Sequence, residues 1–226
     1  MTRTPRPSLT PPSTSPPILR RIRLKVKRVY LDLTGSRQER EWVRARPLIE
    51  SIEGWMFPEE EQWLFCTAYE LPSPANIVEI GSFKGRSTCA LALGCRGTRK
   101  RIFAIDTFDG NGWDLDERDF FREFAQNLQR CSASEYVEPI RGVSTEIART
   151  WASPIHLLFI DGAHEYDAAK GDFESFFPHV VPGGVVAFHD VSEAFPGVWR
   201  LWHETAKLQL ASVGYCKSLG HGRKAV

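Results

Sequence analysis

The chain has 226 residues, of which 42% are hydrophobic, and this length suits one α/β domain with a short extension. A formal net charge of +1 gives the whole molecule no general attraction for nucleic acids or membrane surfaces, and no apolar run approaches the roughly 20 residues that span a membrane. The five cysteines form no C-x-x-C pair, which argues against a structural zinc site or a disulfide framework and favours a reducing, cytoplasmic location.

The first 30 residues differ in composition from the rest of the chain. Residues 1–17 are rich in Pro, Ser and Thr, and they cannot bury enough apolar surface to offset their ordering entropy, so we expect disorder. Residues 20–28 are basic and contain no acid, which predicts a solvated arm. Contact with an anionic surface and an Arg-rich targeting segment are the alternatives, whereas the apolar core of a secretory signal is missing.

Residues 41–71 have helical periodicity, because apolar side chains recur at spacings of three and four. Pro58 and the three glutamates after it are typical of a first helical turn, and Pro72 and Pro74 end the pattern. We therefore divide the chain into a disordered arm (1–30), an N-terminal helical cap (31–75) and a ligand-binding domain (76–226).

From Asn76 onward, short apolar runs alternate with amphipathic stretches. The runs predict strands at residues 77–80, 102–105, 136–140, 155–160 and 185–188. Five strand–helix units imply an α/β fold with a doubly wound, mostly parallel sheet that is covered on both faces. The tail from Leu208 is expected to add edge strands. Ligands of such sheets bind beyond the carboxyl ends of the strands, so the residues directly after each run are the informative ones.

The residues after the first run form a glycine-containing turn, Glu-Ile-Gly-Ser-Phe-Lys-Gly-Arg-Ser, at positions 79–87. Gly81 and Gly85 let the backbone turn sharply and approach a ligand, and Ser87 or its neighbours open a helix. Phe83 occupies the place of the second glycine of a dinucleotide fingerprint, and the spacing of a P-loop is also missing. A plain structural turn is the alternative interpretation.

The residues after the second and third runs suit a nucleoside. Asp106 lies 21 residues past Gly85, where a carboxylate can accept the hydroxyl protons of a ribose, and Phe108 is placed to line the ligand. A helix cap or a loop acid is the alternative for Asp106. Gly142 and Ser144 follow the third run, and Ser144 can act as a helix cap as well as a ligand contact.

The fourth and fifth runs deliver acids and imidazoles to one cleft. Asp161 and His164 follow the fourth run, and His189 and Asp190 follow the fifth. Carboxylates with imidazole suit a divalent cation such as Mg²⁺ or Mn²⁺, which lowers the pKa of a bound hydroxyl. The alternative is that Asp190 caps the next helix and His189 fills a polar pocket.

Together these motifs resemble the class I S-adenosylmethionine (SAM)-dependent methyltransferases with a seven-stranded, Rossmann-like sheet. Within that class the chain is similar to the cephalosporin-hydroxylase-like and catechol-type small-molecule O-methyltransferases, from about Ile52 to the C-terminus. The segments that carry this resemblance are E-I-G-S-F-K-G-R-S, I-D-T-F-D-G, F-I-D-G-A-H-E-Y and P-G-G-V-V-A-F-H-D. The resemblance implies SAM as cofactor, with these binding residues: Glu79, Gly81, Ser82, Phe83, Gly85, Ser87, Asp106, Thr107, Phe108, Gly142, Ser144 and Asp161.

The resemblance also implies metal ligands and catalytic residues. The predicted ligands are Asp161, His189 and Asp190, and the predicted catalytic residues are His164, Asp161 and His189. Two positions depart from the family pattern: His189 stands where an acid is common, and His164 stands where catechol-type enzymes have a lysine base. An imidazole with an ordinary pKa near 6.5 can still take a proton at neutral pH.

The expected reaction is direct displacement, with the sulfonium methyl held in line with an acceptor oxygen. The loop with Trp55 and Met56 is expected to cover the cleft and select a small-molecule acceptor, for which a sugar, a phenol or another natural-product hydroxyl all fit. A nicotinamide-dependent oxidoreductase and a non-catalytic cofactor-binding regulator are the alternative functions. The sequence leaves open whether the protein forms a homo-oligomer.

Overall fold

The computed structural model describes residues 35–110 and 119–225, so the predicted disordered arm at 1–30 lies outside the described residues. Within these ranges seven strands form one sheet in the order β3-β2-β1-β4-β5-β7-β6. The strand bounds are Asn76–Ile80 (β1), Arg101–Asp106 (β2), Val137–Arg141 (β3), Ile155–Ile160 (β4), Val180–Phe188 (β5), Leu210–Cys216 (β6) and Leu219–Lys224 (β7). The first five are parallel, and β7 runs antiparallel to both β5 and β6. The predicted doubly wound, mostly parallel sheet is confirmed.

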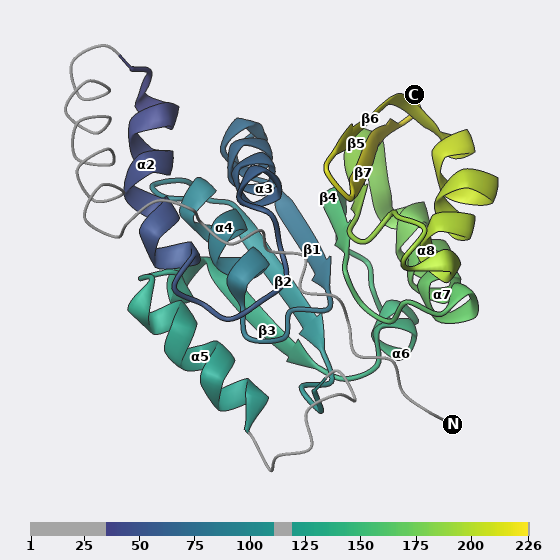
Figure 1. Cartoon of the computed structure of the whole chain (residues 1–226), viewed down its shortest axis with the longest axis horizontal. Helices are drawn as coiled ribbons and strands as arrows, with labels where there is room; N and C mark the ends of the chain where they lie inside the picture. Colours follow the sequence, from purple (N-terminus) through teal and green to yellow (C-terminus); the bar gives the residue numbers. More distant parts are fainter. Residues whose placement is uncertain (1–34, 111–118, 226) are drawn as a thin grey trace.

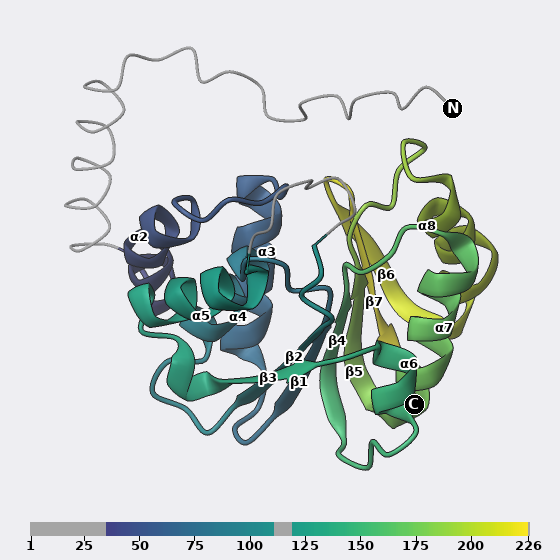
Figure 2. The same cartoon turned by 90° about the horizontal axis from the view of Figure 1, so that it is seen from below.

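Helices cover both faces of the sheet, as Figures 1 and 2 show. One face carries α2 (Arg37–Ile49), α3 (Pro58–Glu70), α4 (Arg86–Gly94) and α5 (Phe120–Arg130). The other carries α6 (Ser144–Ala148), α7 (Tyr166–Phe176) and α8 (Pro196–Leu201). Short helical turns at Ser134–Tyr136, Phe177–His179, Trp202–Ala206 and Lys207–Gln209 complete the described elements. The two layers enclose two apolar cores, one on each side of the sheet.

Local signals explain where the two cap helices begin. Ser36 and Glu39 form a capping box, so α2 begins at Arg37, four residues before the predicted periodicity. In α3, Pro58 takes the first position and the Glu60 carboxylate accepts a hydrogen bond from the Phe57 amide. No helix in the described part of the chain is long and apolar enough to cross a membrane.

The strand order places a topological switch between β1 and β4. From β1 the chain moves outward to β2 and β3, and it then returns to the other side of β1 for β4 and β5. Loops at the carboxyl ends of β1 and β4 therefore diverge to opposite faces and leave a crevice between them. The predicted site residues lie at the carboxyl ends of β1 and β4 and of the neighbouring strands β2, β3 and β5.

Candidate functional site

A cleft of about 1080 Å³ lies along the carboxyl ends of the strands, slightly larger than the roughly 300–1000 Å³ of ordinary small-molecule sites. Residues 53–56 of the loop between α2 and α3 line one part of it, and the loops after β1 to β5 line the rest. Of the predicted cofactor-binding residues, Glu79 and Gly85 do not line the cleft. Those that do are Gly81, Ser82, Phe83, Ser87, Asp106, Thr107, Phe108, Gly142, Ser144 and Asp161.

The turn after β1 depends on its glycines. Gly81 and Gly85 both have φ of 84°, a left-handed conformation that side chains disfavour. A Cβ on Gly81 would also run into the Asp161 carbonyl oxygen, because the ends of β1 and β4 touch there. Gly85 serves as the N-cap of α4, as expected for a turn that opens a helix. The close approach makes Gly81 a structural requirement of the cleft floor.

Asp106 at the end of β2 holds the glycine turn in place. Its Oδ2 accepts hydrogen bonds from the amides of Ser82 and Phe83 at 2.7 and 2.8 Å, and its Oδ1 accepts one from the Phe108 amide at 2.7 Å. Phe108 has a positive φ of 58°. The carboxylate thus ties together the two loops on which the predicted nucleoside contacts lie, and it is not a helix cap.

Glu79 supports the same turn from behind. The side chain is fully buried and accepts hydrogen bonds from the hydroxyls of Ser82 and Thr88. Its Oε1 has no hydrogen-bond partner among the described residues. Burial raises the pKa of Glu79 to about 7. This predicted cofactor residue therefore acts on the cleft through the turn rather than from its surface.

Ser144 reaches across the cleft wall to an acid that the sequence analysis missed. Ser144 is the first residue of α6 and makes no side-chain cap; its hydroxyl donates a hydrogen bond to Asp172 Oδ1. Asp172 lies on α7, is 5% exposed and lines the cleft together with Ala168, one turn earlier. Burial raises the pKa of Asp172 from its ordinary 3.8 to about 6.

Replacement of Asp172 by Asn is expected to stabilise the ligand-free protein at pH 7.5. The carboxyl has a higher pKa in the folded chain than in the unfolded chain, so its ionisation lowers the free energy of unfolding as pH rises from about 4 to about 6. The full effect above pH 6 is roughly 3 kcal/mol. Urea unfolding at pH 5 and pH 7.5 measures it. A stabilisation no larger at pH 7.5 than at pH 5 would contradict this explanation.

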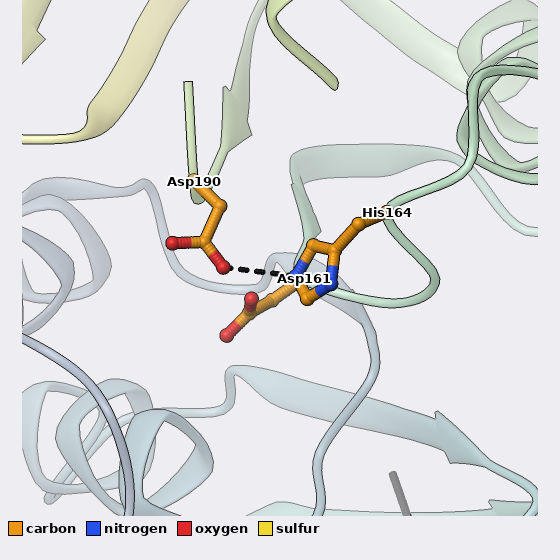
Figure 3. A group of neighbouring side chains, drawn as sticks. All are labelled: Asp161, His164 and Asp190. Carbon is orange, nitrogen blue, oxygen red and sulfur yellow. Dashed lines mark ion pairs between the residues drawn. The ribbon is translucent and has the colours of Figure 1, made fainter. Parts of the chain in front are cut away.

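Asp161, His164 and Asp190 converge at the end of the cleft next to β5 (Figure 3). One potential metal-ligating atom from each residue lies within 4.8 Å of the others. His164 Nε2 and Asp190 Oδ2 are 2.9 Å apart. Burial raises the pKa of Asp190, but hydrogen bonds from His164 and His189 outweigh it, and the net pKa lies below the ordinary value. Asp190 has a φ of 59°, which turns its side chain back toward the cleft.

The role of His189 as a metal ligand stays a prediction, and in the structure both nitrogens of its ring have other partners. Its Nδ1 is 3.1 Å from Asp161 Oδ1 and its Nε2 is 3.0 Å from Glu60 Oε2, so both ring nitrogens already have carboxylate partners. Burial lowers the pKa of His189, but these acids outweigh it and raise the pKa well above 6.5. A protonated imidazole has no lone pair for a cation. Among the described residues, Asp161, His164 and Asp190 form a group that could hold a metal ion.

Glu60 is a second residue that the sequence analysis missed as part of the site. The side chain is fully buried at the start of α3. Besides His189 and the Phe57 amide, its carboxylate accepts hydrogen bonds from the Ser218 amide and hydroxyl at 2.9 and 2.7 Å. Glu60 thus links helix α3 to the end of β5 and to the turn between β6 and β7. No local sequence signal marks this role, because His189 lies 129 residues away.

The cap loop contributes an aromatic wall to the cleft. Trp55 is 49% exposed and packs on Phe83, with ring centroids 5.3 Å apart. Arg86 fastens this loop by donating hydrogen bonds to the carbonyls of Ile52 and Gly54, and it also pairs with the buried Glu61. The expected position of Trp55 and Met56 beside the cleft is therefore confirmed. Their selection of an acceptor stays a prediction.

The chain is similar in sequence to a methyltransferase family and to two curated proteins. A family model described as a methyltransferase domain matches residues 78–191. An uncharacterised protein of Sinorhizobium fredii is 36% identical over 145 residues, and an O-methyltransferase of Aspergillus hancockii is 25% identical over 148 residues. These matches cover 60% and 65% of this chain, but only 15% and 53% of the relatives.

Solved structures share the fold. The O-methyltransferase TomG from Streptomyces achromogenes, involved in tomaymycin synthesis and solved in complex with SAM, is similar with a TM-score of 0.59. The likeness covers 91% of this chain and 98% of TomG at 18% sequence identity, which establishes a common fold. The architecture of β1 to β7 is therefore one that other proteins use around SAM.

Proposed function

Because this chain belongs to the methyltransferase domain family, we propose that it transfers the methyl group of SAM to a hydroxyl oxygen of a small-molecule acceptor. One observation carries the proposal. A single cleft joins the glycine turn and Asp106, which suit a nucleoside, to an end where an imidazole and two carboxylates converge. The first part suits the cofactor, and the second suits removal of a proton from the acceptor.

The described residues fit SAM. When bound, SAM supplies an electrophilic methyl group on a sulfonium sulfur. The turn at 81–85 lets the backbone approach the ligand, and Asp106 provides a carboxylate with lone pairs left for the ribose hydroxyls. Residues 142–145 border the remaining part of the nucleoside side. The volume of about 1080 Å³ leaves room for an acceptor beside the cofactor.

Asp106→Asn is expected to weaken binding of S-adenosylhomocysteine by about 10- to 100-fold, the effect of losing hydrogen bonds to a charged group. Both oxygens of Asp106 accept from backbone amides, so the NH2 group of Asn would face either the Phe108 amide or the amides of Ser82 and Phe83. Calorimetric titration checks this. Asp109→Asn is the control, because Asp109 is exposed and its side chain pairs only at 3.4 Å with Arg141. Equal affinities in the two variants would contradict the role of Asp106.

His164 is the proposed base. Its Nε2 is bonded to Asp190 Oδ2, which orients the ring and stabilises the imidazolium that forms when His164 takes the acceptor's hydroxyl proton. His189 Nδ1 lies 3.1 Å from Asp161 Oδ1 and 3.5 Å from Asp190 Oδ2, so it helps to keep both carboxylates in position while the proton moves. The oxygen then attacks the methyl carbon as the sulfonium sulfur leaves.

The same group fits a divalent cation. Asp161, His164 and Asp190 would supply two carboxylates and one imidazole, a donor set that suits Mn²⁺ and, less well, Mg²⁺. A bound cation would lower the pKa of the acceptor hydroxyl and orient it. His164 cannot act as a base and bind a cation at once. If a cation is bound, His164 would therefore act as its ligand and not as the base.

The names of relatives, the cleft lining and the cysteines bear on the acceptor and on the location of the protein. The names of the Aspergillus and Streptomyces relatives support transfer to oxygen. Trp55 and Met56 in the cap loop form the acceptor side of the cleft, and we propose that they select the acceptor. All five cysteines are free thiols, which supports a cytoplasmic location.

The test is release of S-adenosylhomocysteine from SAM across matched acceptors that carry a hydroxyl, an amine or a thiol, with added Mn²⁺, Mg²⁺ or a chelator. Turnover with hydroxyl acceptors alone is expected. Loss of turnover in chelator would assign His164 to cation binding, whereas unchanged turnover would assign it as the base. Cofactor binding without turnover across the panel would instead support a non-catalytic regulator, and binding of NAD in place of SAM would support an oxidoreductase.

A further inference from the structure

We infer that Asp172 recognises the exocyclic amino group of the cofactor's adenine and so sets the choice of nucleobase. The inference rests on the proposed function, because it takes SAM as the ligand of the cleft. Asp172 belongs to none of the strand-end motifs and lies within helix α7. Its place in the cleft wall comes from the fold alone.

One carboxylate oxygen of Asp172 accepts a hydrogen bond within the protein, and the other is available to a ligand. Oδ1 accepts the hydrogen bond from the Ser144 hydroxyl. Oδ2 has no hydrogen-bond partner in the described ranges and is not sealed from solvent, since the only buried and unpartnered side-chain oxygens there belong to Glu61 and Glu79. Gly162 leaves Oδ2 uncovered, because a Cβ at that position would lie 3.1 Å from it. An acceptor oxygen therefore faces the cleft from an otherwise buried side chain.

The surroundings of Oδ2 suit the edge of a flat, weakly polar ring. Ile80 and Asp172 Oδ2 both lie next to Gly162, Ala168 lies one helical turn before Asp172, and both apolar residues line the cleft, as do Val143 and Ala163. SAM carries two nitrogen donors, the adenine amino group and the ammonium of its methionine part. The ammonium is strongly hydrated and keeps a charge that apolar walls disfavour, whereas the faces of adenine pack on them. Adenine thus matches both the apolar walls and the open Oδ2 of Asp172.

The test compares two nucleosides that differ at this amino group and at the adjacent ring nitrogen N1, which is an acceptor in adenine and an N–H donor in hypoxanthine. S-inosylhomocysteine carries a carbonyl oxygen where S-adenosylhomocysteine carries the amino group, so its acceptor would face the Asp172 carboxylate. Wild-type protein is expected to prefer the adenine form by at least about 10-fold, the size of one hydrogen bond to a charged group. In Asp172→Asn the side-chain amide can donate to that carbonyl, so the preference is expected to fall below about 3-fold or to reverse. Calorimetric titration measures each affinity.

The ratio of the two affinities separates recognition from general damage. A variant that merely distorts the cleft weakens both ligands alike, and an unchanged ratio in Asp172→Asn would overturn the inference. The same ratio is measured with 5′-methylthioadenosine and its inosine counterpart, which lack the ammonium. If Asp172→Asn no longer changes the affinity ratio in that pair, Asp172 binds the ammonium and not the adenine amino group. That result would also overturn the inference. Failure of wild-type protein to bind either homocysteine nucleoside would instead refute the proposed function.

Discussion

Asp190→Asn is expected to lower kcat for methyl transfer by about 10²- to 10⁴-fold, the range that a positioned acid–base system contributes. Asp190 Oδ2 holds the His164 ring at 2.9 Å, and a neutral amide cannot stabilise the imidazolium that forms as the acceptor proton leaves. Asn adopts the left-handed backbone of Asp190, with φ of 59°, more readily than most residues, so the turn should survive. Initial rates at saturating SAM measure the effect.

The affinity for S-adenosylhomocysteine is the internal control for this variant, because Asp190 is not among the predicted cofactor-binding residues. It is expected to change by less than about 3-fold, well under the cost of one lost hydrogen bond. Asp167→Asn is the matched control for rate, since Asp167 is an exposed acid outside the cleft lining. Equal kcat values in the Asp167 and Asp190 variants would show that the His164–Asp190 pair does not take part in catalysis.

Glu60→Ala is expected to lower the free energy of unfolding by about 3–5 kcal/mol, the cost of removing one partner from a buried ion pair. His189 is buried between Glu60 and Asp161, and its raised pKa means that it is charged in the folded protein. Without Glu60 this charge loses one carboxylate, and the Ser218 amide and hydroxyl lose their acceptor. Urea unfolding at neutral pH measures the loss.

Glu59→Ala is the matched control, because Glu59 lies in the same first turn of α3. Its side chain is 55% exposed and pairs with Lys217 at 3.3 Å, so its removal should cost at most about 1 kcal/mol. Glu60→Gln keeps the shape of the side chain and should fall between the two. If Glu60→Ala lowers the free energy of unfolding no more than Glu59→Ala does, the contact between Glu60 and His189 does not stabilise the fold.

The fold was largely predictable because its signals are local and repeated. Each predicted strand run overlaps an observed strand, since short apolar runs between amphipathic helices admit few arrangements other than a parallel sheet. The boundaries were less certain. The predicted run at 185–188 is only the end of β5, which begins at Val180, because Pro182 and the two glycines after it hide the strand's first half.

The site was predictable where its residues directly follow strands. Asp106, Asp161, His164 and Asp190 all line the cleft, because the carboxyl ends of parallel strands meet along one edge of the sheet, and their roles stay predictions. Two acids on helices were missed: Asp172, which lines the cleft from α7, and Glu60, which is fully buried on α3. Glu60 and Asp172 carry no motif, and their roles depend on packing of α3 and α7 against distant loops. The pairing of His189 likewise depends on Glu60, whose carboxylate lies 3.0 Å from the second ring nitrogen of His189.

The central claim is that the cleft binds SAM, and calorimetric titration of wild-type protein with SAM tests it most directly. We predict binding of one molecule per chain with micromolar affinity, competition by S-adenosylhomocysteine and no competition by NAD. Absence of binding by both SAM and S-adenosylhomocysteine would contradict the account, whatever the choice of acceptor or metal.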